Sequence, residues 1–272
     1  MQPHGRALAK LCKHKLQFPM IGSVSSSYHT PGNFIDGAAV NHAEMTITID
    51  GLLIAPLFVA QIDELENHYD VRGPYAEEMG RELAQQYDQN VARVMTLAAR
   101  ASSALTGRSG GSRFSHADMA TSSTEISNGI FSAAQAFDEK KVSPSDRNAF
   151  FRPAHYYLLA QNTTLINKDY NGMGSIASGR IETVAGIDLV KSNNVPSADD
   201  QANTDIHANY RADYSATVGV IANRMAAGTV QLMDISLETD WEPRRQGTFM
   251  VAKMAVGHGI LRADCAVELY DT

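Results

Sequence analysis

The sequence predicts an α+β protein in which strand-forming segments at both ends of the chain enclose a helical and mixed middle section. Apolar and polar residues alternate near residues 45–50, as in a half-buried strand. Apolar residues then recur every fourth position over residues 75–95, as in an amphipathic helix. Strand-like segments return after residue 229. This order, hairpin, long helix, mixed section and strands, indicates an α+β plan with interleaved subdomains.

Length and charge bound the classes of protein that this chain can represent. It has 272 residues, of which 44% are apolar, and this is enough for one large or two smaller folded domains. Its net charge of -7 disfavours tight binding of nucleic acid, which requires a basic excess. No apolar run reaches the roughly 18 residues that would predict a membrane span.

Residues 1–15 are basic and predict an exposed arm. They carry Arg6, Lys10, Lys13 and Lys15 but lack the apolar stretch of a signal peptide. An unstructured terminus is the alternative interpretation. The two cysteines, Cys12 and Cys265, share neither a metal-binding nor a redox spacing, so two unpaired thiols are expected.

Residues 17–60 predict a long β-hairpin. A turn signal lies at residues 30–33, and the return strand alternates over residues 45–50. A second apolar run, residues 52–60, contains Pro56, which predicts an edge strand or a bend. An isolated hairpin is only marginally stable, so either the rest of the subunit or a neighbouring copy must cover it.

A helix of about 30 residues is predicted to begin at Gly73-Pro74. Its apolar stripe runs from Tyr75 to Met95, and acidic and amide side chains occupy the opposite face. A helix of this length measures roughly 45 Å, which is long for a compact protein of this size. We therefore expect a spine along which other elements pack.

The remaining elements are shorter. Residues 102–123 are expected to form a loop, with a flexible linker at residues 107–112 (GRSGGS). Further predictions are a helix at 124–141 with Phe131 in its apolar stripe, a strand at 148–151, a helix at 155–161, a strand pair at 178–191 turning at Ala185-Gly186, an exposed loop at 193–209, a buried strand at 218–222, and strands near 229–240, 248–255 and 265–270.

The sequence offers no specific support for catalysis. None of the nine histidines lies in the helical zinc pattern of metalloproteases. His258 lies between Gly257 and Gly259, for which a histidine at a tight turn is favoured over a catalytic one. The glycine-rich segment 107–112 lacks the lysine of a phosphate-binding loop.

Several motifs, taken in order, resemble the major capsid protein of T7-like podoviruses. They are residues 17–22 (QFPMIG), 46–53 (TITIDGLL), 67–72 (NHYDVR), 228–230 (GTV) and 254–262 (MAVGHGILR). The segment 67–72 is the most specific of them. The chain departs from the family in a short stretch before residue 17 and in abbreviated regions near 101–123 and 161–176. These departures fall in the N-terminal arm and in the middle of the chain.

The resemblance implies the HK97-like capsid fold, with an N-arm, an extended E-loop hairpin, a long spine helix, and peripheral and axial domains. In its terms the N-terminal arm spans residues 1–15 and the E-loop hairpin 16–66. The peripheral domain comprises 67–118, with the spine helix, and the C-terminal strands 228–272. The axial domain comprises 119–227.

The resemblance also implies a non-enzymatic role without metal or cofactor. Copies would assemble in the bacterial cytoplasm as hexamers and pentamers of an icosahedral head shell. The shell would enclose double-stranded DNA without binding it specifically, and it would involve a scaffolding protein during assembly and a portal protein at one vertex. Alternatives are a nanocompartment (encapsulin-type) shell of the same fold, a monomeric enzyme and a DNA-binding protein.

Eight residues are candidates for the contact between subunits. The hairpin contributes the apolar candidates Phe18, Tyr28, Phe34, Ile47 and Ile49. Arg72, Arg244 and Arg245 are candidate partners in salt bridges between subunits. The alternative for each residue is ordinary packing within one subunit.

Overall fold

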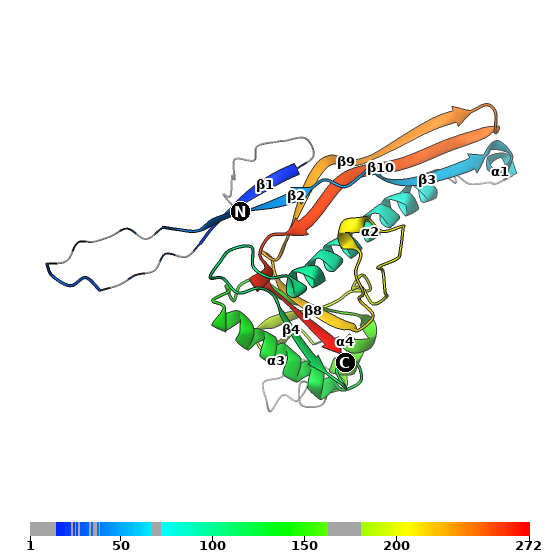
Figure 1. Cartoon of the computed structure of the whole chain (residues 1–272). Coiled ribbons are helices and arrows are strands. Elements are labelled where there is room, and N and C mark those ends of the chain that lie inside the picture. Colours follow the sequence, from blue (N-terminus) through cyan, green and yellow to red (C-terminus); the bar gives the residue numbers. More distant parts are fainter. Residues whose placement is uncertain are drawn as a thin grey trace.

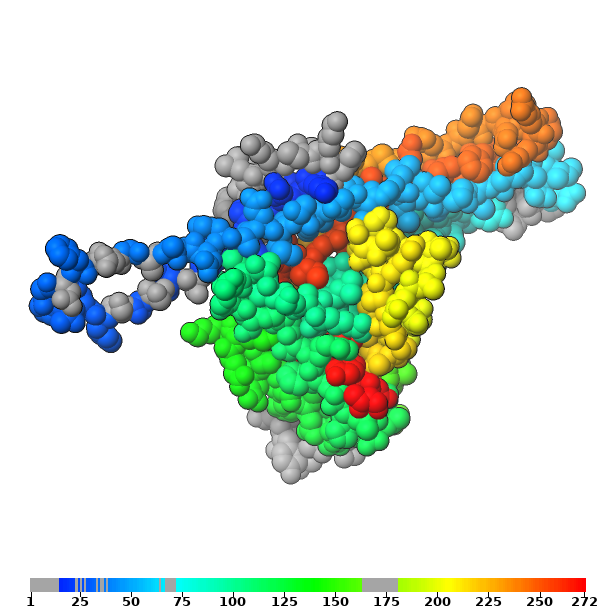
Figure 2. All heavy atoms as spheres, viewed as in Figure 1, coloured from blue at the N-terminus to red at the C-terminus, as the bar shows by residue number. Residues whose placement is uncertain are grey.

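The computed structural model describes residues 15–22, 24, 26, 28–32, 34, 37, 39–66, 72–162 and 181–272. A rounded domain built on a six-stranded sheet lies below an elongated layer of strands and one long helix (Figure 1). A hairpin projects from this layer to one side, and one end of a three-stranded sheet extends to the other (Figure 1 and Figure 2).

The larger sheet has the strand order β4-β11-β8-β5-β7-β6. Its strands are β4 (Ser112–His116), β5 (Arg147–Phe151), β6 (Thr183–Val184), β7 (Ile187–Lys191), β8 (Thr217–Asn223) and β11 (Ala266–Asp271). Helices α3 (Ser123–Glu139) and α4 (Pro153–Ala160) pack against it. Every residue of β8 is buried, as the apolar run at 218–222 predicted. This domain therefore has its own hydrophobic core.

Local signals account for several of these boundaries. Helix α3 begins after Ser122, whose hydroxyl accepts a hydrogen bond from the Glu125 amide at 3.4 Å. Ala185 and Gly186 have φ angles of 52° and 73°, the left-handed values of a tight hairpin turn between β6 and β7. The strand pair predicted around this dipeptide is confirmed. Phe131, by contrast, was wrongly assigned to the apolar stripe of α3, because its side chain is exposed.

The smaller sheet is antiparallel, with the order β3-β10-β9. Its strands are β3 (Leu53–Ala60), β9 (Ala227–Glu242) and β10 (Gly247–Ile260). Pro56 of β3 lies opposite Val251 of β10. β3 is an edge strand of this sheet, as predicted from the missing amide donor of proline. The short helix α1 (Gln61–Glu66) follows β3.

The spine helix α2 (Arg72–Arg100) has 29 residues, which confirms the predicted length. Near its start, Met79 and Leu83 pack on the β3-β10-β9 sheet. Near its end, Ala98 and Ala99 join the core of the six-stranded domain. A four-residue step advances about 40° around a helix of 3.6 residues per turn, so the stripe winds from one partner to the other. The helix thus ties the two sheets together.

The projecting hairpin consists of β1 (Lys15–Ile21) and β2 (His42–Thr48), with Phe18 opposite Met45. The prediction of a single hairpin over residues 17–60 is confirmed for the pairing of β1 with β2 and wrong for residues 52–60. After Asp50-Gly51 the chain no longer pairs with β1, and the next strand, β3, pairs with β10 instead. Alternation identified both strands, but it carries no information about the partner that each strand selects.

Two other predictions are corrected by the packing. The predicted loop 102–123 contains β4, and Gly111 lies tightly against the end of α2. The Gly111 amide donates to the Ala101 carbonyl at 2.9 Å, and a Cβ on Gly111 would lie 2.2 Å from the Ala99 oxygen. A close approach of two backbones, not flexibility, therefore requires this glycine.

The predicted exposed loop 193–209 is partly buried, because Val195, Asp200 and Ile206 face the interior. The final three strands also divide between the sheets: β9 and β10 form the smaller one, whereas β11 pairs with β4 and β8 in the larger one. The arm up to residue 14, residues 67–71 of the 67–72 motif and residues 163–180 lie outside the described part of the chain.

Candidate assembly interfaces

The hairpin leaves the body where β2 crosses β10. A Cβ on Gly257 would lie 2.2 Å from the Thr48 oxygen, and one on Gly259 would lie 2.7 Å from Cγ1 of Ile47. Both glycines are therefore needed for the close approach of β2. The prediction of a turn at Gly257-His258-Gly259 was wrong, because these residues lie within β10. We call this crossing, together with the adjoining residue Asp50, the hairpin base.

His258 points away from β2 into the body. Its ring meets that of Tyr87 of α2 edge to face, with 4.7 Å between the centroids, and its Nδ1 lies 2.9 Å from the Thr229 hydroxyl. Its Nε2 is buried with no hydrogen-bond partner among the described residues. Burial lowers the pKa of His258 to about 4, so the ring is neutral at neutral pH.

Asp50 and Tyr210 join the hairpin base to the six-stranded domain. The Tyr210 hydroxyl donates to the Asp50 carboxylate and accepts the His258 backbone amide at 3.0 Å. His207 Nδ1 lies 3.3 Å from the same carboxylate. Burial raises the pKa of Asp50 despite these lowering contacts, and burial also raises the pKa of Tyr210. The tyrosine therefore remains a hydrogen-bond donor, which fixes the hairpin base to the loop before β8.

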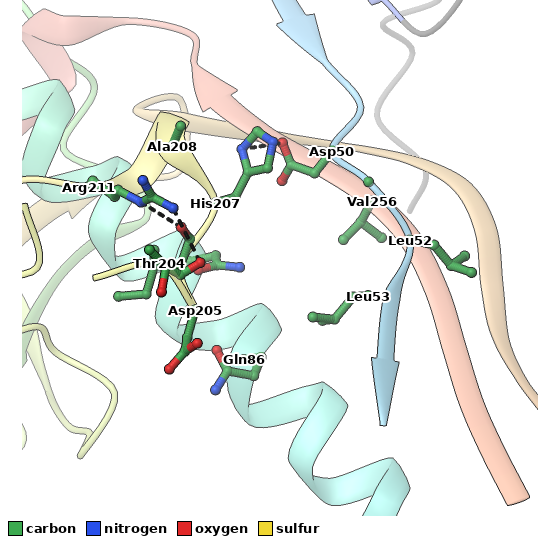
Figure 3. A pocket seen from close by; sticks show the side chains of 13 residues that line it. Asp50, Leu52, Leu53, Gln86, Thr204, Asp205, His207, Ala208, Arg211 and Val256 are labelled. Atoms are coloured by element: carbon green, nitrogen blue, oxygen red, sulfur yellow. Dashed lines mark hydrogen bonds and ion pairs between the residues drawn. The ribbon is translucent and has the colours of Figure 1, made fainter. Parts of the chain in front are cut away.

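A hollow of about 420 Å³ opens beside this junction, between the hairpin base, α2 and the loop around residues 204–211. Figure 3 shows His207 turned toward Asp50 and Arg211 turned toward Thr204. In the described part of the chain, no group of three metal-binding side chains occurs and no helix could cross a membrane. In the lining of the hollow, Asp50 contacts His207 across two elements. Gln86, Asn90 and Arg211 instead form hydrogen bonds within their own helix or loop.

A buried ionic cluster fixes the other end of α2. The Glu268 carboxylate has no exposed surface and accepts hydrogen bonds from Nε of Arg100 and from Nε of Arg113, both at 2.8 Å. Thr217 donates to the same group at 2.8 Å. Burial alone would raise the pKa of Glu268, but the hydrogen bonds from Arg100 and Thr217 and the two arginine charges lower it.

The predicted hairpin candidates fall into three environments. Tyr28 and Phe34 lie in the loop between β1 and β2 and are 104% and 97% exposed. Phe18 and Ile49 are half-buried, and Ile47 is 1% exposed beneath the crossing. Ile47 thus packs within its own subunit and has little surface left for a neighbour. The rings of Tyr28 and Phe34 are therefore accessible to a partner.

The three predicted arginines gather at the outer end of the β3-β10-β9 sheet. Arg72 donates to the Thr248 hydroxyl at 3.1 Å, at the start of β10. Arg244 and Arg245 lie in the turn between β9 and β10, and Arg245 pairs with Glu242 at 3.6 Å. At least two of the three therefore have partners within their own chain.

Sequence reasoning missed the Asp50–Tyr210 and Glu268 clusters. The Asp50–Tyr210 contact joins residues 160 positions apart, so no local pattern reports it. A weak signal existed for Glu268, the single charged residue in the apolar segment 265–270 (CAVELY). Such a residue indicates a buried and paired charge.

An elongated spine, a projecting hairpin with uncovered aromatic rings and a compact second domain define a shell-forming subunit. The structure superimposes on known capsids: it matches the capsid structure of the cyanophage P-SCSP1u with a TM-score of 0.88, at 40% identity, covering 97% of this chain and 85% of that one. The match to the bacteriophage PhiM1 mature capsid has a TM-score of 0.80 at 19% identity, covering 95% and 82% of the two chains.

Curated relatives agree with the structural matches. The chain is 26% identical to the major capsid protein of Escherichia phage T7 over 276 residues, covering 92% of this chain and 80% of the relative. It is 27% identical to the major capsid protein of Enterobacteria phage T3, with the same coverage. The sequence model of Gp10A-like major capsid proteins matches residues 17–270.

The chain belongs to the Gp10A-like major capsid protein family. It is the major capsid protein of a T7-like tailed-phage head, a non-enzymatic subunit that associates with its own copies in the virion shell, with a mixed α/β fold of the HK97-like type. The family match leaves the nanocompartment, enzyme and DNA-binding alternatives without support.

Proposed function

We propose that copies of this chain form the hexamers and pentamers of an icosahedral shell, in which the hairpin of each copy lies over the β3-β10-β9 sheet of the next. The exposure of Tyr28 and Phe34 carries this proposal, because a stable subunit gains nothing by leaving two aromatic rings in water. The sheet offers exposed apolar side chains in return, among them Leu237 and Trp241 of β9.

Such a contact is heterologous: one surface of a subunit meets a different surface of its neighbour. Rotation about an axis then closes a ring of copies, and each ring contact raises the effective concentration for the next one. In this arrangement Arg72, Arg244 and Arg245, at the outer end of the sheet, are the proposed partners for acidic side chains of adjacent subunits.

We assign the domains of the HK97-type capsid fold as an N-arm (1–15), an E-loop (16–66), a peripheral domain (67–118 and 228–272) and an axial domain (119–227). The six-stranded domain is the proposed centre of the rings. Since β4 and β11 belong to its sheet, the axial unit takes strands from both segments given to the peripheral domain.

We also propose that the shell encloses double-stranded DNA without binding it specifically, and that assembly involves a scaffolding protein and a portal protein at one vertex. The net charge of -7 supports weak adhesion to DNA, because fixed phosphate contacts need a basic surface. Movement of the hairpin about its base is the proposed structural change when the shell matures.

Electron microscopy of native particles, together with sedimentation of the purified chain, tests the proposal. Closed icosahedral particles that contain DNA are expected. A chain that remains monomeric in the presence of its scaffolding protein would contradict it. Substituting the exposed rings, Tyr28→Ser with Phe34→Ser, should block closure without unfolding the subunit.

A further inference from the structure

The outer edge of β9 is a long strand edge without a partner in the described part of the chain. β10 pairs with one side of β9 along its whole length, from Gly247 opposite Glu242 to Ile260 opposite Ala227. No described strand pairs with the other side. A long exposed strand edge that carries apolar side chains is a site of unwanted pairing unless something covers it.

The side chains of β9 restrict the chemistry of what can cover it. Four carboxylates and four exposed apolar side chains lie along the strand: Asp234, Glu238, Asp240 and Glu242, and Leu232, Ile235, Leu237 and Trp241. Lys253 pairs with Glu238 and Arg245 with Glu242, while Asp240 has no ion-pair or hydrogen-bond partner among the described residues. A matching segment must therefore combine basic and apolar residues.

Residues 1–14 of this chain have that composition. Arg6, Lys10 and Lys13 alternate with apolar residues that include Leu8 and Leu11. The positive charges of residues 1–14 and the carboxylates of β9 attract each other, and the same carboxylates repel acidic segments. Residues 1–14 contain no acidic side chain, so their positive charges are not neutralised within the segment.

The start of the described chain lies near the correct end of β9. Lys15 is opposite Thr48, the Thr48 oxygen approaches Gly257 closely, and Gly257 is opposite Val230. Three such steps place Lys15 within about 15 Å of Val230. Fourteen extended residues span about 46 Å, and β9 from Val230 to Glu242 measures about 40 Å, so the lengths agree.

We infer that residues 1–14 lie along the outer edge of β9 of their own subunit, running from the hairpin base toward the β9–β10 turn. This contact covers an edge that would otherwise pair at random, and it links the arm to the sheet proposed to receive the neighbouring hairpin. It does not depend on ring closure, so it is present in the unassembled subunit.

The native Cys12 serves as a reporter, because the other thiol, Cys265, is buried. Cys12 is three residues from Lys15 and reaches about 10 Å from it. Asp234 lies about 13 Å along β9 from Val230, whereas Asp240 lies about 33 Å along it. With a short bis-maleimide reagent, the Asp234→Cys variant should cross-link to Cys12 severalfold more than the Asp240→Cys variant.

Moving the reporter should reverse this preference. In a Cys12→Ser background, Arg6→Cys should cross-link to Asp240→Cys in preference to Asp234→Cys. Glu139→Cys, an exposed acidic position on α3, is the matched control and should give background yield with either reporter. Lys10→Glu with Lys13→Glu should reduce the yield severalfold, and Lys10→Arg with Lys13→Arg should restore it.

Mass spectrometry of cross-linked peptides, from a mixture of isotopically labelled and unlabelled subunits, identifies the chain that supplies each thiol. Peptides from a single chain are expected. Peptides that mix the two labels would overturn the inference in favour of a neighbouring copy's arm, and equal yields at positions 139 and 234 would overturn it altogether. Shells that form without the cross-link would refute this inference alone, whereas cross-linked subunits that never form shells would refute only the proposed assembly.

Discussion

The six-stranded domain and the projecting hairpin bury their apolar side chains by different means. In the domain, Ile126, Phe137 and Phe151 have no exposed surface, because strands and helices of the same chain enclose them. In the hairpin, Tyr28 and Phe34 are almost entirely exposed. A core of the first kind stabilises the subunit before it meets a partner. The exposed rings contribute hydrophobic free energy only if a partner covers them, as proposed for assembly. The comparison separates residues that fold the subunit from residues proposed to build the shell.

The largest loss of subunit stability is expected for Glu268→Ala. The substitution removes a buried carboxylate and leaves Arg100, Arg113 and Thr217 without their acceptor. Breaking a buried ion pair in this way costs about 3–5 kcal/mol of unfolding free energy. Urea unfolding of the unassembled subunit measures it. Glu77→Ala, which removes an exposed pair with Arg81, should cost less than about 1 kcal/mol, and equal losses would contradict the distinction.

The next effect is a loss of stability in mild acid through His258. Its pKa is 6.5 in the unfolded chain and about 4 in the folded one, so between these values the unfolded state binds a proton that the folded state does not. The unfolding free energy should therefore fall by about 1.4 kcal/mol per pH unit as pH decreases through this window. Urea titrations from pH 7 to 4 measure the slope, and His258→Gln should flatten it. An unchanged slope in that variant would assign the effect to other groups.

A smaller effect is expected for Tyr210→Phe at the hairpin base. Without the hydroxyl, the Asp50 carboxylate loses a donor and the His258 amide loses its acceptor. Leaving such buried groups without a partner costs about 1–3 kcal/mol. Hydrogen exchange at residues 47–50 should increase at the same time. Tyr157→Phe, which removes an exposed contact with Lys191, is the control and should change neither quantity.

The double substitution of the exposed hairpin rings, Tyr28 and Phe34, is expected to have the smallest effect on subunit stability and the greatest effect on assembly. Tyr28→Ser with Phe34→Ser should change the unfolding free energy by less than about 0.5 kcal/mol, because both side chains are already in water. Shell yield, measured by sedimentation, should nevertheless collapse. Phe131→Ser, an exposed ring on α3, should leave the yield near the parent value. A large loss of stability in the double variant would show that the hairpin loop is part of the subunit's own core.

Local sequence patterns predicted the elements that depend on local chemistry. The alternation around Ile47 identified β2, Pro74 and the apolar stripe after it identified α2, and Ala185-Gly186 identified the β6–β7 turn. The motif order from residue 17 onward predicted the family, which the match over residues 17–270 confirms. Periodicity and turn chemistry are properties of a few adjacent residues, and each of these predictions uses only those.

Strand partners and buried polar contacts required the tertiary structure. The parallel pairing of β4 with β11 places Ser112 opposite Val267, and Arg100 reaches Glu268 across 168 positions. Strand alternation identifies a face but not a neighbour, so it could not place β11 in the larger sheet, apart from β9 and β10. The glycines around His258 were likewise interpreted as a turn, because the strand that crosses them lies some 200 residues earlier in the chain.

The sequence by itself determined the family, the spine helix, the hairpin and the net negative charge of this capsid subunit. The tertiary structure decided where the hairpin is attached, which charges are buried and which aromatic rings remain in water. The physical reason is that burial and pairing depend on distances between segments far apart in the chain. Identical side chains such as Phe34 and Phe151 therefore have opposite environments, 97% and 0% exposed, that no local pattern distinguishes.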